Sequence, residues 1–139
     1  MHHALEKILT ASQKNWRLVF RHFPLTQLHP YALEAAIAAE AAGEQGKFWQ
    51  MHDLLYGDPS LSSARIKRYV QQLGLDLSRF NTAIKTTAKA KVENDLKLTD
   101  RLRLPGTPML LICEANGHVR TTSIEEMQSK MPGKASPWK

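Results

Sequence analysis

The sequence has a single cysteine, Cys113, so no disulfide can form within one chain. Dithiol redox chemistry needs an attacking and a resolving thiol, and one cysteine cannot supply both. Cys113 also stands in an apolar run, where we expect an inert, buried thiol. We therefore expect no catalytic residue in this chain.

Long hydrophobic runs are missing as well. No apolar stretch approaches the ~18 residues of a membrane-spanning helix, so we expect no membrane span. Residues Met1–Leu9 have neither the basic region nor the long apolar region of a signal peptide. As written, the chain would be cytoplasmic.

Cofactor signatures are also absent. There is no Gly-rich phosphate loop, no repeat and no Cys/His cluster with metal-ligand spacing, so we expect neither a cofactor nor a metal. Lysine and arginine number 19 against 13 acidic residues, a net charge of +6. These cations alternate with acids and alanines, as on solvated helix faces, so nucleic acid is not an expected partner.

Most of the chain has a helical pattern. At 139 residues and 42% hydrophobic, it suits a single domain with a core of its own. Ser62 or Ser63 is expected to cap one helix, which Gly74 then ends in a left-handed conformation. Helices are expected over His3–Ser12, Tyr31–Ala42, Lys47–Tyr56, Ser62–Leu73, Ser78–Ile84, Lys89–Leu104 and Ile124–Met131.

Three stretches predict strands. Trp16–Phe23 is rich in aromatic and β-branched residues and ends at a proline. Met109–Ile112 is uninterrupted and apolar, which predicts a strand buried on both faces. Asn116-Gly117 is a strong hairpin signal, so Val119–Thr122 should return as an antiparallel strand. His22, near the end of the first strand, has no nucleophile or carboxylate at a recognisable spacing, and we assign it no acid–base role.

The turn before the second strand contains two prolines and a glycine. Pro105 and Gly106 prevent the preceding helix from continuing. The Thr107–Pro108 bond is a candidate cis peptide, because the trans preference of an X–Pro bond is only ~0.5–1 kcal/mol. On these residues alone, an ordinary trans proline is the alternative.

The segments Arg17–Leu25, His29–Ala36 and Gly46–Tyr56, followed by Gly-Thr-Pro before an apolar strand, resemble the DsbA-like branch of the thioredoxin superfamily. The resemblance covers Ala4 to about Met131. It implies an α/β, thioredoxin-like (DsbA-type) fold over residues 1–139. This fold would be a single domain with a helical insertion at about 30–104 and an N-terminally truncated mixed sheet.

The same resemblance implies a binding site. Gly106, Thr107 and Pro108 would form a cis-proline loop whose backbone pairs with an extended peptide or protein substrate. The family's Cys-x-x-Cys motif, however, is absent from this chain. Either the sequence starts after the motif or the protein is a degenerate member, and we favour a late start because the downstream pattern is intact. A missing leader would also leave the compartment open between cytoplasmic and extracytoplasmic.

Two functions follow from this resemblance. The first is membership of the thiol–disulfide oxidoreductase family without its catalytic pair, inactive as written. The alternative is a non-catalytic thioredoxin-fold module that binds peptides. Loss of the first strand would leave Trp16–Phe23 and Met109–Ile112 without a neighbour, so we also expect a homodimer that covers the exposed edge, unless the two strands close up and pair directly.

Overall fold

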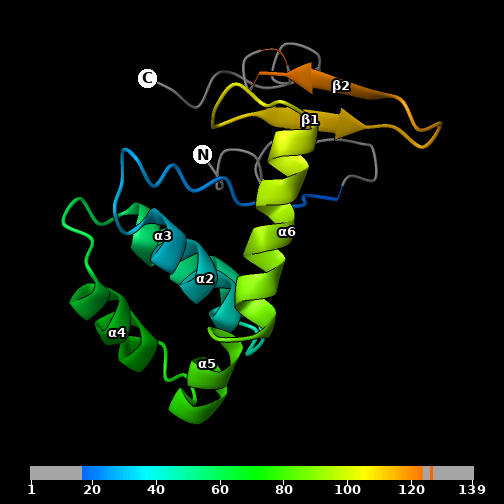
Figure 1. Ribbon diagram of the computed structural model, residues 1–139. Helices are drawn as coiled ribbons and strands as arrows, with labels where there is room; N and C mark the ends of the chain where they lie inside the picture. Colours follow the sequence, from blue (N-terminus) through cyan, green and yellow to red (C-terminus); the bar gives the residue numbers. More distant parts are fainter. Residues whose placement is uncertain (1–16, 124–125, 127–139) are drawn as a thin grey trace, which may run out of the picture. The chain divides into compact units, whose positions relative to one another are not determined.

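The structure, a computed structural model, describes residues 17–123 and residue 126 (Figure 1). The chain divides into two compact units. One is Arg21–Leu104, and the described part of the other comprises residues 17–20, 105–123 and 126. The helices predicted over His3–Ser12 and Ile124–Met131 lie outside the described residues, apart from Glu126, which is helical.

The unit Arg21–Leu104 is entirely helical in its regular structure (Figure 1). Its helices are α2 (Ala32–Gly43), α3 (Phe48–Tyr56), α4 (Ser63–Gln72), α5 (Leu77–Ala83) and α6 (Thr87–Arg101). Alanines fill the buried face of α2 and let α3 and α6 pack closely against it. Met51 and Leu55 of α3 are buried there, as their helical spacing predicts.

Local capping explains where α4 and α5 begin and end. The Ser62 hydroxyl accepts a hydrogen bond from the Arg65 N–H, and Gly74 adopts a φ of +63° just past the end of α4, both as predicted. The predicted cap of α5 is wrong. Asp76, not Ser78, accepts the Arg79 N–H at 2.8 Å, so the helix starts earlier, at Leu77.

A buried carboxylate, that of Asp58, holds the turn between α3 and α4. It accepts hydrogen bonds from the Tyr69 hydroxyl at 2.6 Å and from the Ser60 N–H at 2.9 Å. It also pairs with Arg65. The Ser62 cap and the contacts of Asp58 all lie within about a dozen residues of sequence. The turn between α3 and α4 therefore depends on local sequence, and it forms where the sequence predicts it.

Helix α6 is offset from its predicted range. It starts two residues before Lys89 and ends at Arg101 instead of Leu104. Arg103 follows with a φ of 49°, and the Leu104 N–H bonds back to the Thr99 carbonyl at 3.1 Å, which closes the helix. Val92, predicted to face inward, is fully buried.

The other unit contains a β-hairpin. β1 (Leu110–Cys113) pairs antiparallel with β2 (Val119–Thr122), in a register that sets Leu110 opposite Thr122 and Cys113 opposite Val119. Gly117 has a φ of +84° in the connecting loop, the conformation that the Asn-Gly signal predicts. The hairpin prediction is confirmed.

Two strand predictions need correction. The strand predicted over Trp16–Phe23 does not form in its described part, residues 17–23. There the His22 backbone N–H donates to the carboxylate of Asp95 instead of to a neighbouring strand. The apolar strand starts at Leu110 and is not buried on both faces, since Leu111 is 40% exposed. Cys113 lies on the same face by strand alternation, and it is exposed instead of buried.

No helix within the described residues is both long and apolar enough to cross a bilayer. A helical unit and an antiparallel hairpin are compatible with many α/β folds. The thioredoxin-like fold class and the predicted single domain with an insertion at about 30–104 therefore stay predictions.

Candidate functional site

A buried histidine, His22, joins the first residues of the helical unit to three of its helices. It is 6% exposed. Its backbone N–H donates to Oδ2 of Asp95 on α6 at 2.9 Å, and its ring Nε2 lies 3.1 Å from Oε1 of Glu40 on α2. The Phe48 ring of α3 meets it edge-on, with ring centroids 6.0 Å apart. His22 is thus held in place by α2, α3 and α6.

Asp95 anchors this arrangement from α6. It is 4% exposed, and Arg21 Nη1 donates to its Oδ1 at 2.9 Å while its other oxygen accepts the His22 N–H. A buried carboxylate is costly unless it is paired and hydrogen-bonded, and here both of its oxygens have partners. The Arg21 side chain is 62% exposed, so the guanidinium stays partly hydrated while it neutralises Asp95.

Glu40 is the second carboxylate. Its Oε2 lies 3.4 Å from Lys91 Nζ of α6, while Oε1 faces His22. The hydrogen bond with His22 is the largest cause that lowers the pKa of Glu40 below its ordinary value. Burial acts in the opposite direction, and the charges of His22 and Lys91 add to the lowering. Glu40 is therefore ionised at neutral pH.

Arg21, His22, Glu40, Lys91 and Asp95 form what we call the His22 cluster. Two cations balance its two carboxylates, and the His22 ring nitrogen lies within hydrogen-bond distance of the Glu40 carboxylate. Within the described residues, no group of three His, Cys, Asp or Glu side chains is placed to hold a metal ion. The contacts of the cluster hold residues 21–22 against α2 and α6, which is a structural role.

An aromatic ladder runs along α3 away from Phe48. Phe48 and Trp49 meet edge to face at 4.9 Å, Trp49 and His52 at 5.4 Å, and His52 stacks on Tyr56 at 4.4 Å. His52 is buried, whereas Tyr56 is 70% exposed. The ladder therefore runs from partly buried rings to an aromatic ring at the surface.

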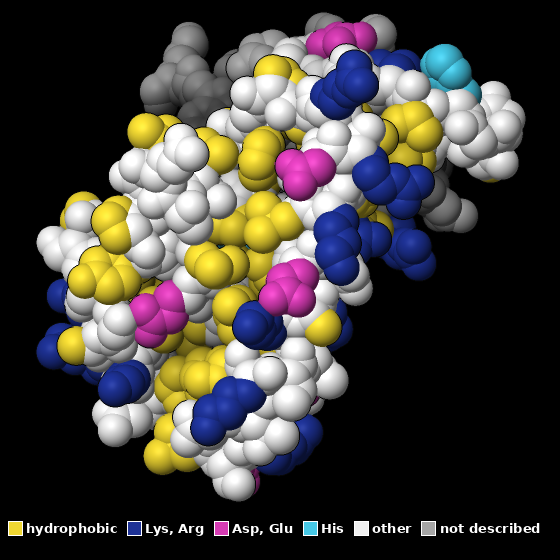
Figure 2. Space-filling model, in the orientation of Figure 1, with side chains coloured by type: hydrophobic (Ala, Val, Ile, Leu, Met, Phe, Trp, Pro, Cys, Tyr) yellow, Lys and Arg dark blue, Asp and Glu magenta, His cyan; other side chains and the backbone are white. Residues whose placement is uncertain are grey.

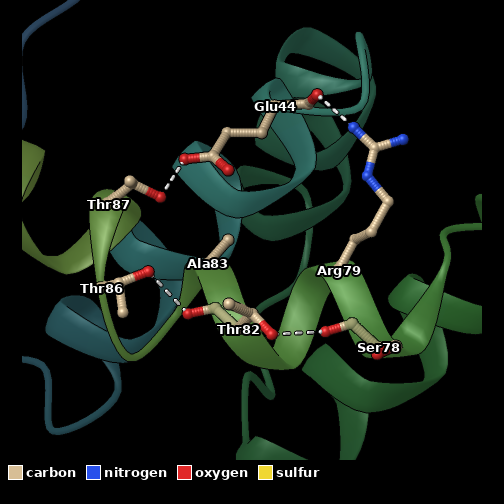
Figure 3. A pocket seen from close by; sticks show the side chains of 7 residues that line it. All are labelled: Glu44, Ser78, Arg79, Thr82, Ala83, Thr86 and Thr87. Carbon is tan, nitrogen blue, oxygen red and sulfur yellow. Dashed lines mark hydrogen bonds between the residues drawn. The ribbon is translucent and has the colours of Figure 1, made fainter.

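A shallow pocket of about 330 Å³ opens where α5 meets α6 (Figure 3). Its polar groups are largely used within the protein. Arg79 Nη2 donates to the Glu44 carbonyl at 3.3 Å, and the Thr87 hydroxyl donates to the Glu44 carboxylate. The hydroxyls of Thr82 and Thr86 donate to carbonyls one turn earlier. The pocket therefore offers few free groups to a ligand.

The predicted site residues lie in the other unit, just before β1. The Thr107–Pro108 bond is cis, as predicted. Thr107 and Pro108 are exposed, and Gly106 is partly buried. Nothing in the structure tests these residues as a binding loop, so that role stays a prediction.

Sequence reasoning missed the partners of His22. Glu40 is 18 residues away and Asp95 is 73 away, so neither has a recognisable spacing. One signal was available. Glu40 lies four residues after Ala36, and therefore on the alanine-lined inner side of α2, where a carboxylate requires a partner.

No protein-family model and no solved structure matches the chain. Eight curated relatives match, and each is named a Na(+)/H(+) antiporter NhaA. The chain is 45% identical over 98 residues to Na(+)/H(+) antiporter NhaA 3 of Salinispora tropica, which covers 69% of this chain and 15% of that protein. It is 42% identical over 128 residues to Na(+)/H(+) antiporter NhaA 1 of Salinispora arenicola, and this match covers 91% of this chain and 19% of that protein. It is 36% identical over 98 residues to Na(+)/H(+) antiporter NhaA 1 of Mycolicibacterium gilvum, and this match covers 68% of this chain and 16% of that protein. The chain thus spans less than a fifth of the length of these curated relatives.

These relatives correct the family prediction. Proteins that are 30% to 45% identical over most of the chain are named antiporters, so the prediction of a DsbA-like oxidoreductase is wrong. The alternative, a non-catalytic thioredoxin-fold module that binds peptides, has no support either. The short motifs that carried the resemblance determine local backbone structure, which does not by itself determine function.

The predicted partners change as well. An extended peptide substrate is not what the names of these relatives indicate. Secondary transporters, NhaA among them, are built from transmembrane helices, so the expectation of no membrane span is contradicted for the relatives as whole proteins, of which this chain matches less than a fifth. The expected homodimer is not tested by the structure of one chain.

Proposed function

We propose that this chain is part of an NhaA-type Na(+)/H(+) antiporter and lies in water beside the membrane-spanning part of that protein. The observation that carries the proposal is the 42% identity to the Salinispora arenicola antiporter over 128 residues. That stretch is 19% of the relative, which leaves most of its length for the ion path.

The surface of α6 supports a position in water. Lys89, Glu93, Lys97 and Arg101 are all exposed on this helix. A charged side chain at the centre of a bilayer costs ~2.5–3.5 kcal/mol on insertion scales. Figure 2 shows charged side chains spread among hydrophobic ones on the face in view. Such a surface is stable against water or lipid headgroups and unstable against acyl chains.

The buried polar groups favour a structural role, and not ion transport, for the unit Arg21–Leu104. In the His22 cluster both carboxylates are matched by cations and hydrogen bonds within the unit. Such a cluster holds helices together and does not require a transported ion. Exchange of sodium for protons would then belong to the rest of the antiporter.

Cell fractionation tests the proposal for this chain. An antibody raised against the chain is used to probe membrane and soluble fractions of its source cells. We expect a band much larger than 15.7 kDa in the membrane fraction. A band of 15.7 kDa confined to the soluble fraction would overturn the proposal.

Deletion in a relative tests the position in water. The segment that aligns with this chain is removed from the Salinispora arenicola antiporter, and sodium-dependent proton movement is followed in everted membrane vesicles with a pH-sensitive dye. We expect exchange to persist. Loss of all exchange, with the shortened protein present in the membrane at normal abundance, would show that the segment belongs to the ion path.

We also propose, separately, that the thioredoxin-like fold class predicted from the sequence applies to this chain. A helical unit followed by an antiparallel hairpin is the order that this fold with a helical insertion requires, and other α/β folds share that order. A solution structure of the chain tests the proposal. We expect a further strand paired with the free edge of β1, and a hairpin that remains two-stranded would contradict it.

A further inference from the structure

Three cations gather at the C-terminal end of α6. Lys97, Arg101 and Arg103 are exposed, and within the described residues none of them forms an ion pair. The other two lysines of α6 differ. Lys89 pairs with Glu93 at 3.8 Å, and Lys91 pairs with Glu40 at 3.4 Å. The end of the helix therefore has a net positive charge, with Asp100 as the one acidic residue between Lys97 and Arg103.

An exposed apolar side chain lies next to two of these cations in the sequence. Leu102 is 49% exposed and lies between Arg101 and Arg103 in the sequence. Burying a leucine side chain from water is favourable, and arginines can extend their stems along an apolar layer while the guanidinium binds phosphate. This combination of leucine and arginine is suited to the boundary between headgroups and acyl chains.

We propose that the end of α6, formed by Lys97, Arg101, Leu102 and Arg103, docks on the anionic headgroups of a membrane. The proposal rests on the proposed function, because attachment to a membrane-spanning protein keeps the unit near a bilayer. Clusters of lysine and arginine next to a membrane-spanning segment are attracted to anionic lipid, and tethering raises the effective concentration of a weak contact.

A second basic surface of the same unit provides a matched control. Lys67 and Arg68 of α4 are exposed, and α4 contains no acidic residue. No large hydrophobic side chain of α4 is exposed, because Ile66, Tyr69 and Val70 are buried. If net charge alone drives membrane binding, charge reversal at either surface should weaken binding equally. If binding needs leucine and arginine together, only changes at the end of α6 should weaken it.

Co-sedimentation with vesicles tests the proposal on the full chain. The vesicles contain either phosphatidylcholine alone or phosphatidylcholine with one third phosphatidylglycerol, at low and physiological salt. We expect binding to the anionic vesicles only, weakened by salt because surface charge is screened. R101E/R103E should weaken it at least tenfold and L102S severalfold, whereas K67E/R68E should change it less than threefold. Circular dichroism checks that each variant is folded.

Several outcomes would overturn the proposal. These are no binding to anionic vesicles, equal loss in R101E/R103E and K67E/R68E, or no effect of L102S. Tighter binding to a DNA oligonucleotide than to vesicles, lost in R101E/R103E, would assign the surface to nucleic acid instead. Vesicle binding measures the surface directly and fractionation measures the parent protein, so the docking proposal and the proposed function fail in distinguishable ways.

Discussion

The ring Nε2 of His22 lies 3.1 Å from the carboxylate oxygen Oε1 of Glu40, although the two residues are 18 apart in the sequence. The contact links the start of the helical unit to α2, and Glu40 in turn meets Lys91 on α6. Three separate segments therefore depend on the charge of a single glutamate. The stability of the unit should respond to that charge.

Replacing Glu40 with glutamine should lower the free energy of unfolding by about 1–3 kcal/mol, because the buried imidazole and Lys91 lose their anionic partner. Urea denaturation at pH 7 measures it. Glu93→Gln is the matched control, since that glutamate pairs with Lys89 on an exposed surface and should matter by less than about 0.5 kcal/mol. Equal effects of the two changes would show that the His22–Glu40 contact adds no stability.

The contribution of Glu40 should depend on pH. Its pKa is lowered in the folded protein, chiefly by the hydrogen bond with His22, so the folded state favours the carboxylate. The resulting stability is present above the ordinary glutamate pKa of 4.5 and is lost as the pH falls through the lower, folded-state pKa. The difference in unfolding free energy between the native protein and Glu40→Gln should therefore shrink between pH 5 and pH 3. A difference that stays constant over this range would contradict the prediction.

Asp95 should protect the backbone of residues 21–22 against local opening, because its carboxylate accepts the His22 N–H. In Asp95→Ala the buried His22 N–H loses its acceptor, which costs about 1–3 kcal/mol, whereas Asp95→Asn keeps one oxygen to accept it and should cost less. Native-state hydrogen exchange of the His22 amide reports the local opening. We expect the fastest exchange in Asp95→Ala, and unchanged exchange there would mean that another group holds the segment. Asp100→Ala, at an exposed position of α6, serves as the control.

The core of the helical unit should be sensitive at Met51. Its side chain is fully buried between α3 and its neighbours, so Met51→Ala leaves a cavity and should cost about 2–5 kcal/mol. Leu28→Ala is the comparison, because Leu28 is 69% exposed. Thermal denaturation of both variants provides the measurement, and a similar melting temperature for the two would argue against the described core.

Gly74 should tolerate asparagine better than alanine. Its φ is +63°, a left-handed conformation that costs an ordinary residue about 1–2 kcal/mol and asparagine less. No atom lies within 4 Å of where a Cβ would stand, so the cost should come from the backbone and not from a clash. In denaturant unfolding, Gly74→Asn should be more stable than Gly74→Ala. A more stable Gly74→Ala would point to a steric cause.

Local features of this protein follow from the sequence by itself. The Ser62 cap, the left-handed Gly74 and the Asn-Gly loop of the hairpin each depend on residues within a few positions of one another. Helix-forming runs and apolar spacing likewise place most of the helices to within a few residues. Capping, glycine conformation and helical periodicity are short-range effects, so they can be read before the fold is known.

Only the tertiary structure decided what His22 contacts. Strand propensity at residues 17–23 predicted pairing with another strand, but the His22 N–H binds Asp95 from 73 residues away, and Glu40 holds the ring. The exposure of Cys113 likewise depends on which neighbours cover the hairpin. These contacts join segments far apart in the chain, and a single sequence contains no spacing rule for such pairs. The buried cluster therefore had to be found in three dimensions.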